Sequence, residues 1–152
     1  MNNLGLLYAN GQGVAQDYGT AREWFEKAAA EGDPTAMTRL GLLYENGFGL
    51  PQDYGKAREW FEKAAAKDKT TAMTRLGLLY VNGQGVAQDY GTAREWFEKA
   101  AAKDNTTAMN NLALLYYNGR GVAQDYGTAR EWFDKAAAKD NTTAMNNLAL
   151  LY

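Results

Sequence analysis

The chain has 152 residues, a formal net charge of −2 and 46% hydrophobic residues. This is enough chain for one domain with a substantial core, and its near-neutral charge favours neither nucleic acid nor an anionic membrane as a partner. Because it contains no Cys, His or Ser, the sequence excludes disulfides, the usual zinc sites and a serine–histidine triad. No apolar run approaches the roughly 20 residues that span a bilayer, and no signal-like segment follows Met1.

The whole sequence repeats one unit. Methionines recur 36 residues apart, at Met1, Met37, Met73, Met109 and Met145. They delimit a final half-unit, 145–152, and four full units: 1–36, 37–72, 73–108 and 109–144. A fixed period of this size is typical of stacked helical or strand units that contact only their neighbours. We therefore expect residues 1–152 to form a single repeat array.

The first helical pattern of each unit spans about 13 residues and is clearest in NTTAMNNLALLYYNG at 105–119. Asn105 is the predicted N-cap, and Leu112 and Leu115 belong to an apolar stripe at helical spacing. The Asn-Gly pair at its end predicts the stop. In the second unit, Asp33 followed by a proline is a strong start signal.

The second helical pattern, DYGTAREWFEKAAA, begins at Asp17, the predicted N-cap. Trp24 and Phe25 fall on its apolar side, whereas the charged residues fill the other side, with a glutamate and a lysine paired at i, i+4. This predicts an outer helix whose tryptophan and phenylalanine both anchor the core. On that basis Trp60→Ala should cost about 3–5 kcal/mol through cavity formation.

The stretch YANGQGVAQDY joins the two patterns and recurs in nearly the same form in every full unit, most changed as YENGFGLPQDY in the second. A phosphate cradle would need a GxGxxG loop after a strand or a Walker lysine, and neither is present. A connector is strongly favoured: Gly11 ends the helix in a left-handed conformation, Gly13 allows a second one, and Val14 turns inward. Phe48 and Arg120, at the variable centre of this loop, are left as candidate partner contacts.

The order and spacing of small and aromatic residues resemble the Sel-one-like repeat family, a subgroup of the tetratricopeptide-like helical repeats. The matching residues in the second unit are Ala36, Leu40, Gly41, Tyr44, Gly47, Gly49, Asp53, Ala57, Trp60, Ala64 and Ala65. The resemblance implies an all-α fold, a right-handed α–α superhelix or solenoid of 36-residue helix-turn-helix repeats, and adaptor roles in protein complexes, signalling and bacterium–host contact. A cysteine-rich branch associated with penicillin binding gains no support from a chain without Cys. Asp68, Asp104 and Asp140 replace the family's usual glycine after the second helix, at some cost in a left-handed cap.

The units differ mainly at their second, third and ninth residues. On a helical wheel the second and ninth lie within about 20° of each other, opposite the core stripe and beside the invariant sixth leucine. In the family that the chain resembles, this face lines a concave groove. The predicted partner-binding residues are therefore Asn2, Arg39, Leu42, Glu45, Arg75, Leu78, Val81, Asn110, Leu114, Tyr117 and Asn146.

The sequence favours a non-enzymatic adaptor that binds a protein or an extended peptide in this groove, with no cofactor and no metal. It assembles no acid, base or nucleophile in a pocket. A second interpretation stays open: a structural or engineered, consensus-like array, or a fragment of a longer array, with no evolved ligand. The matching MNNLGLLY and MNNLALLY at the two ends also predict weak head-to-tail self-association.

Overall fold

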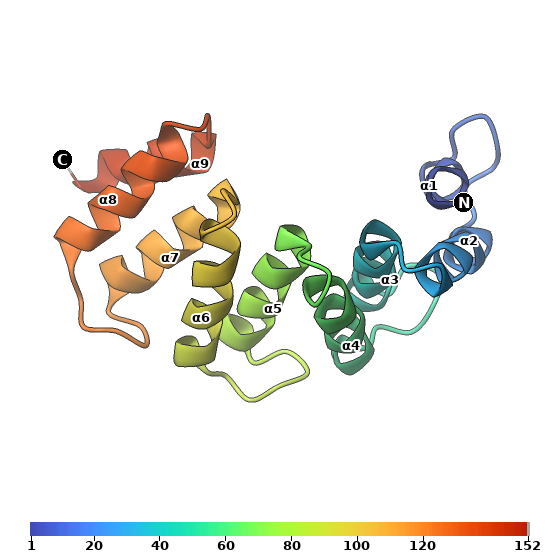
Figure 1. Ribbon diagram of the computed structural model, residues 1–152, viewed down its shortest axis with the longest axis horizontal. Coiled ribbons are helices and arrows are strands. Elements are labelled where there is room, and N and C mark those ends of the chain that lie inside the picture. The colour runs from blue at the N-terminus through green and yellow to red at the C-terminus, as the bar shows by residue number, and fades with distance from the viewer. Residues whose placement is uncertain (152) are drawn as a thin grey trace. The chain divides into compact units, whose positions relative to one another are not determined.

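A computed structural model describes residues 1–151, and all its regular structure in that range is helical (Figure 1). The expected all-α class of helix-turn-helix repeats is confirmed. Tyr152, the last residue of the predicted half-unit, lies outside the described residues. The helices are α1 (Asn2–Asn10), α2 (Tyr18–Ala30), α3 (Pro34–Asn46), α4 (Tyr54–Ala65), α5 (Thr70–Asn82), α6 (Tyr90–Ala101), α7 (Thr106–Asn118), α8 (Tyr126–Ala137) and α9 (Thr142–Leu148), followed by a 3-10 turn, η1 (Ala149–Leu151).

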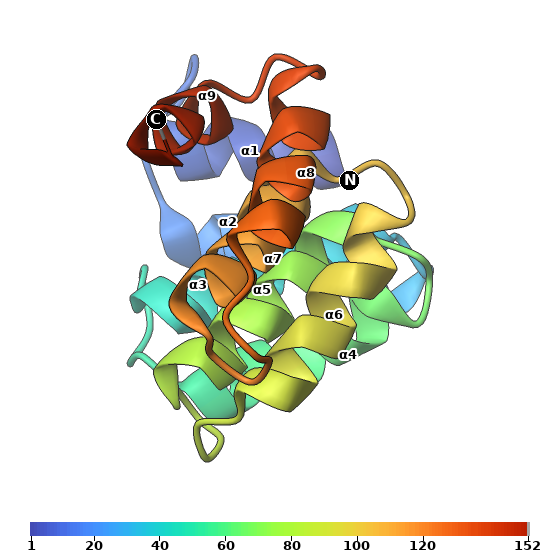
Figure 2. The same ribbon diagram turned by 90° about the vertical axis from the view of Figure 1, so that its left-hand side faces the viewer.

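The chain divides into two compact units, Met1–Ala72 and Met73–Tyr152, here called the N-terminal and C-terminal units. In the N-terminal unit α3 packs against α2 and α4, and α1 packs against α2. In the C-terminal unit α7 packs against α6 and α8, and α9 packs against α8 (Figures 1 and 2). The division falls where the second 36-residue unit meets the third. The formation of one continuous array stays a prediction.

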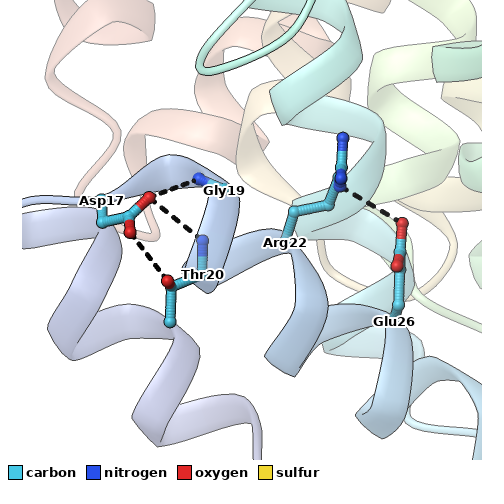
Figure 3. A network of polar contacts seen from close by, with 5 residues as sticks. All are labelled: Asp17, Gly19, Thr20, Arg22 and Glu26. Carbon is cyan, nitrogen blue, oxygen red and sulfur yellow. Dashed lines mark hydrogen bonds and ion pairs between the residues drawn. The ribbon is translucent and has the colours of Figure 1, made fainter.

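Aspartate side chains start the second helix of each full repeat, as predicted. Asp17 Oδ1 accepts hydrogen bonds from the backbone N–H groups of Gly19 and Thr20 at 2.9 and 3.1 Å, and the Thr20 hydroxyl donates to Oδ2 at 2.7 Å (Figure 3). Asp89 accepts the equivalent bonds from Gly91 and Thr92, and Asp125 accepts from the backbone N–H and the hydroxyl of Thr128. These bonds satisfy backbone donors that the first turn of a helix leaves without partners.

Left-handed residues end both kinds of helix. Gly11 closes α1 with a φ of 64°, and Gly13 follows with a φ of 75°, so both glycine predictions are confirmed. After the second helices the predicted aspartates Asp68, Asp104 and Asp140 take φ values of 61°, 64° and 62°. A side chain in this region is disfavoured by roughly 1–2 kcal/mol relative to glycine, although aspartate tolerates it better than most residues.

The core of each repeat is built on a phenylalanine of the second helix. Phe25, Phe61, Phe97 and Phe133 are at most 2% exposed. The predicted equal role of the tryptophans is wrong, because Trp24 and its counterparts are only half-buried. The Lys27 ammonium lies 4.5 Å from the centre of the Trp24 ring, and the ion pair along this helix joins Arg22 to Glu26 (Figure 3). Each tryptophan thus covers the rim of the core beneath a lysine.

The loop between the two helices packs onto the preceding repeat. A Cβ added at Gly49 would lie 2.5 Å from Tyr18 Cβ, and the ring of Phe48 stacks on the Tyr18 ring with centroids 5.1 Å apart. In the C-terminal unit the Arg120 guanidinium lies 5.6 Å from the centre of the Tyr90 ring. The second glycine of the loop therefore allows one repeat to approach the next closely.

The predicted inward position of Val14 is wrong, because this side chain is 38% exposed. Polar contacts close the loop instead. The Gln16 amide donates to the carbonyl of Ala9 at 2.8 Å and to the Tyr18 hydroxyl at 2.9 Å, and the Asp17 N–H donates to the Tyr8 carbonyl at 2.9 Å. Because these bonds already fix the path of the loop, its valine is left on the outside.

Candidate functional site

The first helices of the N-terminal unit frame an apolar pocket of about 220 Å³. Leucines from α1 and α3 form its floor, and the stacked rings of Tyr18 and Phe48 form one wall. Phe48 remains 45% exposed, so the wall is open to an incoming group. The lining residues of this apolar pocket are Leu6, Ala9, Asn10, Tyr18, Phe25, Arg39, Leu42, Leu43 and Phe48.

A second pocket of about 240 Å³ adjoins the first, since Arg39 and Leu42 line both. Its other lining residues come from the first turn of α3 and from the start of α5. It contains two cations and no carboxylate among its lining residues. We call it the cationic pocket, and it is lined by Thr35, Thr38, Arg39, Leu42, Lys69 and Thr71.

The two cations of this pocket have few partners within the protein. The Lys69 ammonium donates to the Thr35 hydroxyl at 3.0 Å. Among the described residues the Arg39 side chain forms no ion pair, and its Nε is buried without a hydrogen-bond partner. Burial lowers the pKa of Arg39, and the charge of Asp33 acts in the opposite direction. Arginine stays protonated at neutral pH, so the pocket keeps its positive charge.

The C-terminal unit has a counterpart of the apolar pocket, two periods or 72 residues later in the sequence. This hollow measures about 120 Å³ and is lined by Leu78, Val81, Phe97, Asn111, Leu114, Leu115, Asn118 and Arg120. Three exchanges alter it: Val81 stands at the position of Ala9, Asn111 at that of Arg39, and Arg120 at that of Phe48. The larger valine narrows the space, and the aromatic wall is replaced by a cation.

Five of the predicted partner-binding residues line these pockets: Arg39, Leu42, Leu78, Val81 and Leu114. In both units the pockets centre on the third and sixth residues of the repeat. Phe48 and Arg120, the candidate contacts at the loop centre, also line them, whereas Lys69 and Tyr18 were missed by sequence reasoning. Lys69 carried a usable signal, because the same position holds asparagine at Asn105 and Asn141.

The second position of the repeat turns toward the interior in the middle of the chain. Thr38, Thr74 and Asn110 are buried, at 4%, 5% and 6% exposure. The Asn110 Oδ1 accepts a hydrogen bond from the Asn147 amide at 2.9 Å, which links α7 to α9. This predicted groove residue therefore lies between helices. The second position is one residue, or about 100° of helix rotation, from the third. This rotation turns the second residue toward the interior. The third and sixth residues line the pockets, on the side of the first helices here called the open face.

The remaining predicted residues lie apart from the pockets. Tyr117 is half-buried and meets the Tyr126 ring edge-on, with centroids 5.3 Å apart. Asn146 is exposed on α9, whereas Glu45 and Arg75 are half-buried. Asn2 lines a separate hollow near Met1 and Asn3. Binding by any of these residues stays a prediction.

Among residues 1–151 no cluster of acidic side chains is arranged to hold a metal ion. Over the same range, none of the helices has both the length and the apolar character needed to cross a bilayer. The chemistry available on the open face is therefore apolar contact, amide hydrogen bonding and cationic attraction, the last from Arg39 and Lys69 in the N-terminal unit and from Arg120 in the C-terminal unit. These are properties of a binding surface.

The Sel1 repeat model matches four consecutive segments: 1–33, 34–69, 70–105 and 106–141. The last three segments begin three residues before the corresponding 36-residue units, at the starts of α3, α5 and α7. The chain is similar to a protective antigen that is present in uropathogenic Escherichia coli strains and displays an SLR fold. The two are 38% identical over 99% of this chain, with a TM-score of 0.93. A Sel1 repeat protein from Oxalobacter formigenes is 36% identical, also over 99% of the chain, with a TM-score of 0.92.

The chain spans 32% of the length of the E. coli antigen and 61% of the Oxalobacter protein. A cysteine-rich protein from Helicobacter pylori shares the fold, with a TM-score of 0.68 over 87% of this chain and all of that chain, at 22% identity. No curated protein matches the sequence.

Proposed function

The chain belongs to the Sel1 repeat family, whose members are generally protein-interaction scaffolds, and we propose that it is a non-enzymatic adaptor that binds an extended peptide. The peptide lies along the open face of the first helices within each unit. The observation that carries this proposal is the pair of equivalent pockets, one in each unit, floored by the same leucines of the repeat. A pocket that recurs two periods later along the chain suits an extended ligand, whose backbone is itself repetitive.

The pockets combine the two features that extended peptides require. Half-buried Leu42 and Leu114 offer apolar surface to side chains, and such surface in a hollow marks an interaction site more than scattered surface leucines do. The Asn111 amide lines the second pocket and supplies both a donor and an acceptor for a peptide backbone. Side chains would thus be held by the leucines and the main chain by amides.

A structural or consensus-like array with no evolved ligand is the competing function. Near-perfect repetition favours it, since the second helices differ at very few positions. The two functions make different demands on the surface. A ligand-binding array needs the open face of the first helices, whereas a bare scaffold is indifferent to changes on that face provided that the fold is kept.

A selection from a random library of displayed 12-residue peptides tests the proposal. Peptides selected on the parent chain are re-tested on a face variant, Leu42→Asn with Leu114→Asn, and on a back variant, Glu59→Gln with Glu131→Gln, whose changes lie on exposed parts of second helices. Circular dichroism verifies that all three are folded. We expect peptides to bind the parent and the back variant and to lose at least tenfold in affinity on the face variant, as removal of central apolar contacts does. Equal binding to all three proteins would contradict the proposal.

Head-to-tail association through the terminal repeats stays a separate prediction. Light scattering of the whole chain over a range of concentrations measures it. A mass that rises with concentration would support association, and a constant monomer mass would exclude it.

A further inference from the structure

We propose that the cationic pocket of the N-terminal unit is a carboxylate subsite for the bound peptide. Arg39 and Lys69 hold the carboxylate, and the adjoining apolar pocket holds a neighbouring apolar or aromatic side chain. This inference rests on the proposed peptide-binding function and specifies its ligand: a peptide in which an acidic group lies next to an apolar one.

The placement of Lys69 is the first argument. The residue at this point of the repeat precedes a first helix and normally caps it: Asp33 accepts from backbone N–H groups of α3, Asn105 caps α7 and Asn141 caps α9. Lys69 carries no acceptor, and its positive charge lies at the helix end that repels cations. Lys69 thus lacks the capping function that its counterparts have in the other repeats, and such a departure indicates a role other than folding.

The direction of the Lys69 side chain is the second argument. Its ammonium reaches across to the Thr35 hydroxyl at 3.0 Å, in the first turn of α3. This single neutral hydroxyl satisfies one of its three donors. The pocket into which it projects also holds Arg39, whose Nε is buried without a partner. A buried cationic donor in this state is stabilised when an anion enters the pocket.

The shared wall between the two pockets is the third argument. Because Arg39 and Leu42 line both, a group in the cationic pocket and a group in the apolar pocket are neighbours along one ligand. The Arg39 guanidinium also lies 5.8 Å from the centre of the Phe25 ring, which holds the planar fork against an apolar surface. A carboxylate fits this fork through two parallel hydrogen bonds.

The C-terminal unit supplies an internal reference. Its residues at the corresponding positions are neutral: Asn111 replaces Arg39 and Asn141 replaces Lys69. Asn141 is also occupied in folding, since it accepts from the Ala144 N–H at 2.9 Å and donates to the Thr106 hydroxyl at 3.2 Å. The pair of cations is therefore confined to the N-terminal unit, whereas the C-terminal hollow has Arg120 alone and folds without this pair.

The test compares each selected peptide with two altered forms, one with every Asp and Glu replaced by Asn and Gln and one with only its C-terminus amidated. Fluorescence anisotropy measures each form on the parent, on Arg39→Asn with Lys69→Asn, and on a control, Lys67→Asn with Lys135→Asn, which removes the same charge from exposed sites. Both asparagines of the pocket variant already occur at equivalent positions of this chain, so the variant is expected to fold. We expect loss of the carboxylate, or of the pocket cations, to reduce affinity on the order of tenfold, as the loss of a charge-assisted hydrogen bond does.

Two further observations would support the inference: the control binds like the parent, and the altered form that has lost affinity binds the parent and the pocket variant equally. Whichever of the two altered forms binds weakly identifies the carboxylate as a side chain or the C-terminus. Equal binding of the acidic peptide and both of its altered forms overturns the carboxylate subsite and leaves peptide binding intact. Equal weakening by the control variant also overturns it, because the attraction would then come from overall charge. Failure to select any face-dependent peptide overturns both proposals.

Discussion

The two units of this chain have the same scaffold and different open faces. In both, a nearly unexposed phenylalanine of the second helix centres each repeat, and an aspartate caps that helix. On the open face the N-terminal unit has a larger pocket, an aromatic wall and two cations, whereas the C-terminal unit has a narrower hollow with amides and one arginine. Residues that repeat without change therefore build the fold, and those that vary between repeats set the chemistry of the surface.

The loop centre illustrates this division. Phe48 and Arg120 occupy the same point of their repeats, and each lies over the tyrosine that opens the second helix of the preceding repeat, Tyr18 and Tyr90. Ring stacking and a cation over a ring fill the same space between repeats. Both units therefore keep a contact between the loop centre and this tyrosine, but Phe48 adds apolar surface whereas Arg120 adds charge.

The largest effects should come from the shared core and should be equal in the two units. Phe61→Ala and Phe133→Ala each remove a ring that is at most 1% exposed, so each should lower the free energy of unfolding by about 3–5 kcal/mol. Trp60→Ala should cost clearly less, because this ring is only half-buried under the Lys63 ammonium. Urea unfolding followed by circular dichroism measures all three. If Trp60→Ala lowered the free energy of unfolding as much as Phe61→Ala, Trp60 would be a core residue equivalent to Phe61.

The next effect concerns the approach of one repeat to another. Ala at Gly13, Gly49 or Gly121 places a side chain at positive φ, but only the last two would also drive it into a tyrosine Cβ, at 2.5 and 2.7 Å. Gly49→Ala and Gly121→Ala should therefore cost roughly 1–3 kcal/mol more than Gly13→Ala. Thermal unfolding of the three variants checks this. Equal costs at all three glycines would mean that the loop contact is not part of the common scaffold.

A smaller effect, of opposite sign in the two units, is expected where the helix caps differ. Lys69→Asn supplies the acceptor that Asn105 and Asn141 provide elsewhere, so it should stabilise the start of α5 by about 1 kcal/mol. Asn141→Lys should destabilise the C-terminal unit by a similar amount. Hydrogen exchange at the first turns of α5 and α9 locates both changes. If Lys69→Asn proved destabilising, the lysine would be a structural residue and the argument for its role in binding would fail.

Much of the fold was predictable from the sequence, because period, caps and stops are local signals. Asp17, Asn105 and Gly11 could be assigned from their neighbours alone, since a cap needs only a short side chain at the right spacing. The error at Trp24 had a different origin. A helical wheel gives the direction of a side chain and not its depth, so two adjacent aromatics on one side were treated alike although only Phe25 reaches the interior.

The candidate site was less accessible to sequence reasoning. The wheel joined the second position to the ninth, yet Asn110 is taken inward by a hydrogen bond from Asn147 of a neighbouring helix, a contact between residues 37 apart. Lys69 lies outside the first helix and enters the pocket by crossing to Thr35, 34 residues away. Such contacts depend on how repeats stack, and a pattern within one repeat does not contain that information.

The smallest effect should be equal in the two units, because their aspartate caps share one geometry. The Thr20 hydroxyl donates to Asp17 Oδ2 and the Thr128 hydroxyl donates to Asp125 Oδ2, both at 2.7 Å. Hydrogen bonds from these threonines lower the pKa of both aspartates. Thr20→Val and Thr128→Val should therefore each raise the pKa of the capping aspartate toward its ordinary value. Because a lowered pKa stabilises the folded state above the unfolded value of about 3.9 and the contribution is lost as pH falls through the folded value, each variant should also lose less stability in acid than the parent does. Carboxyl chemical shifts between pH 2 and 6, an interval chosen to bracket about 3.9, measure both pKa values, and clearly unequal changes would show that the two units cap their helices differently.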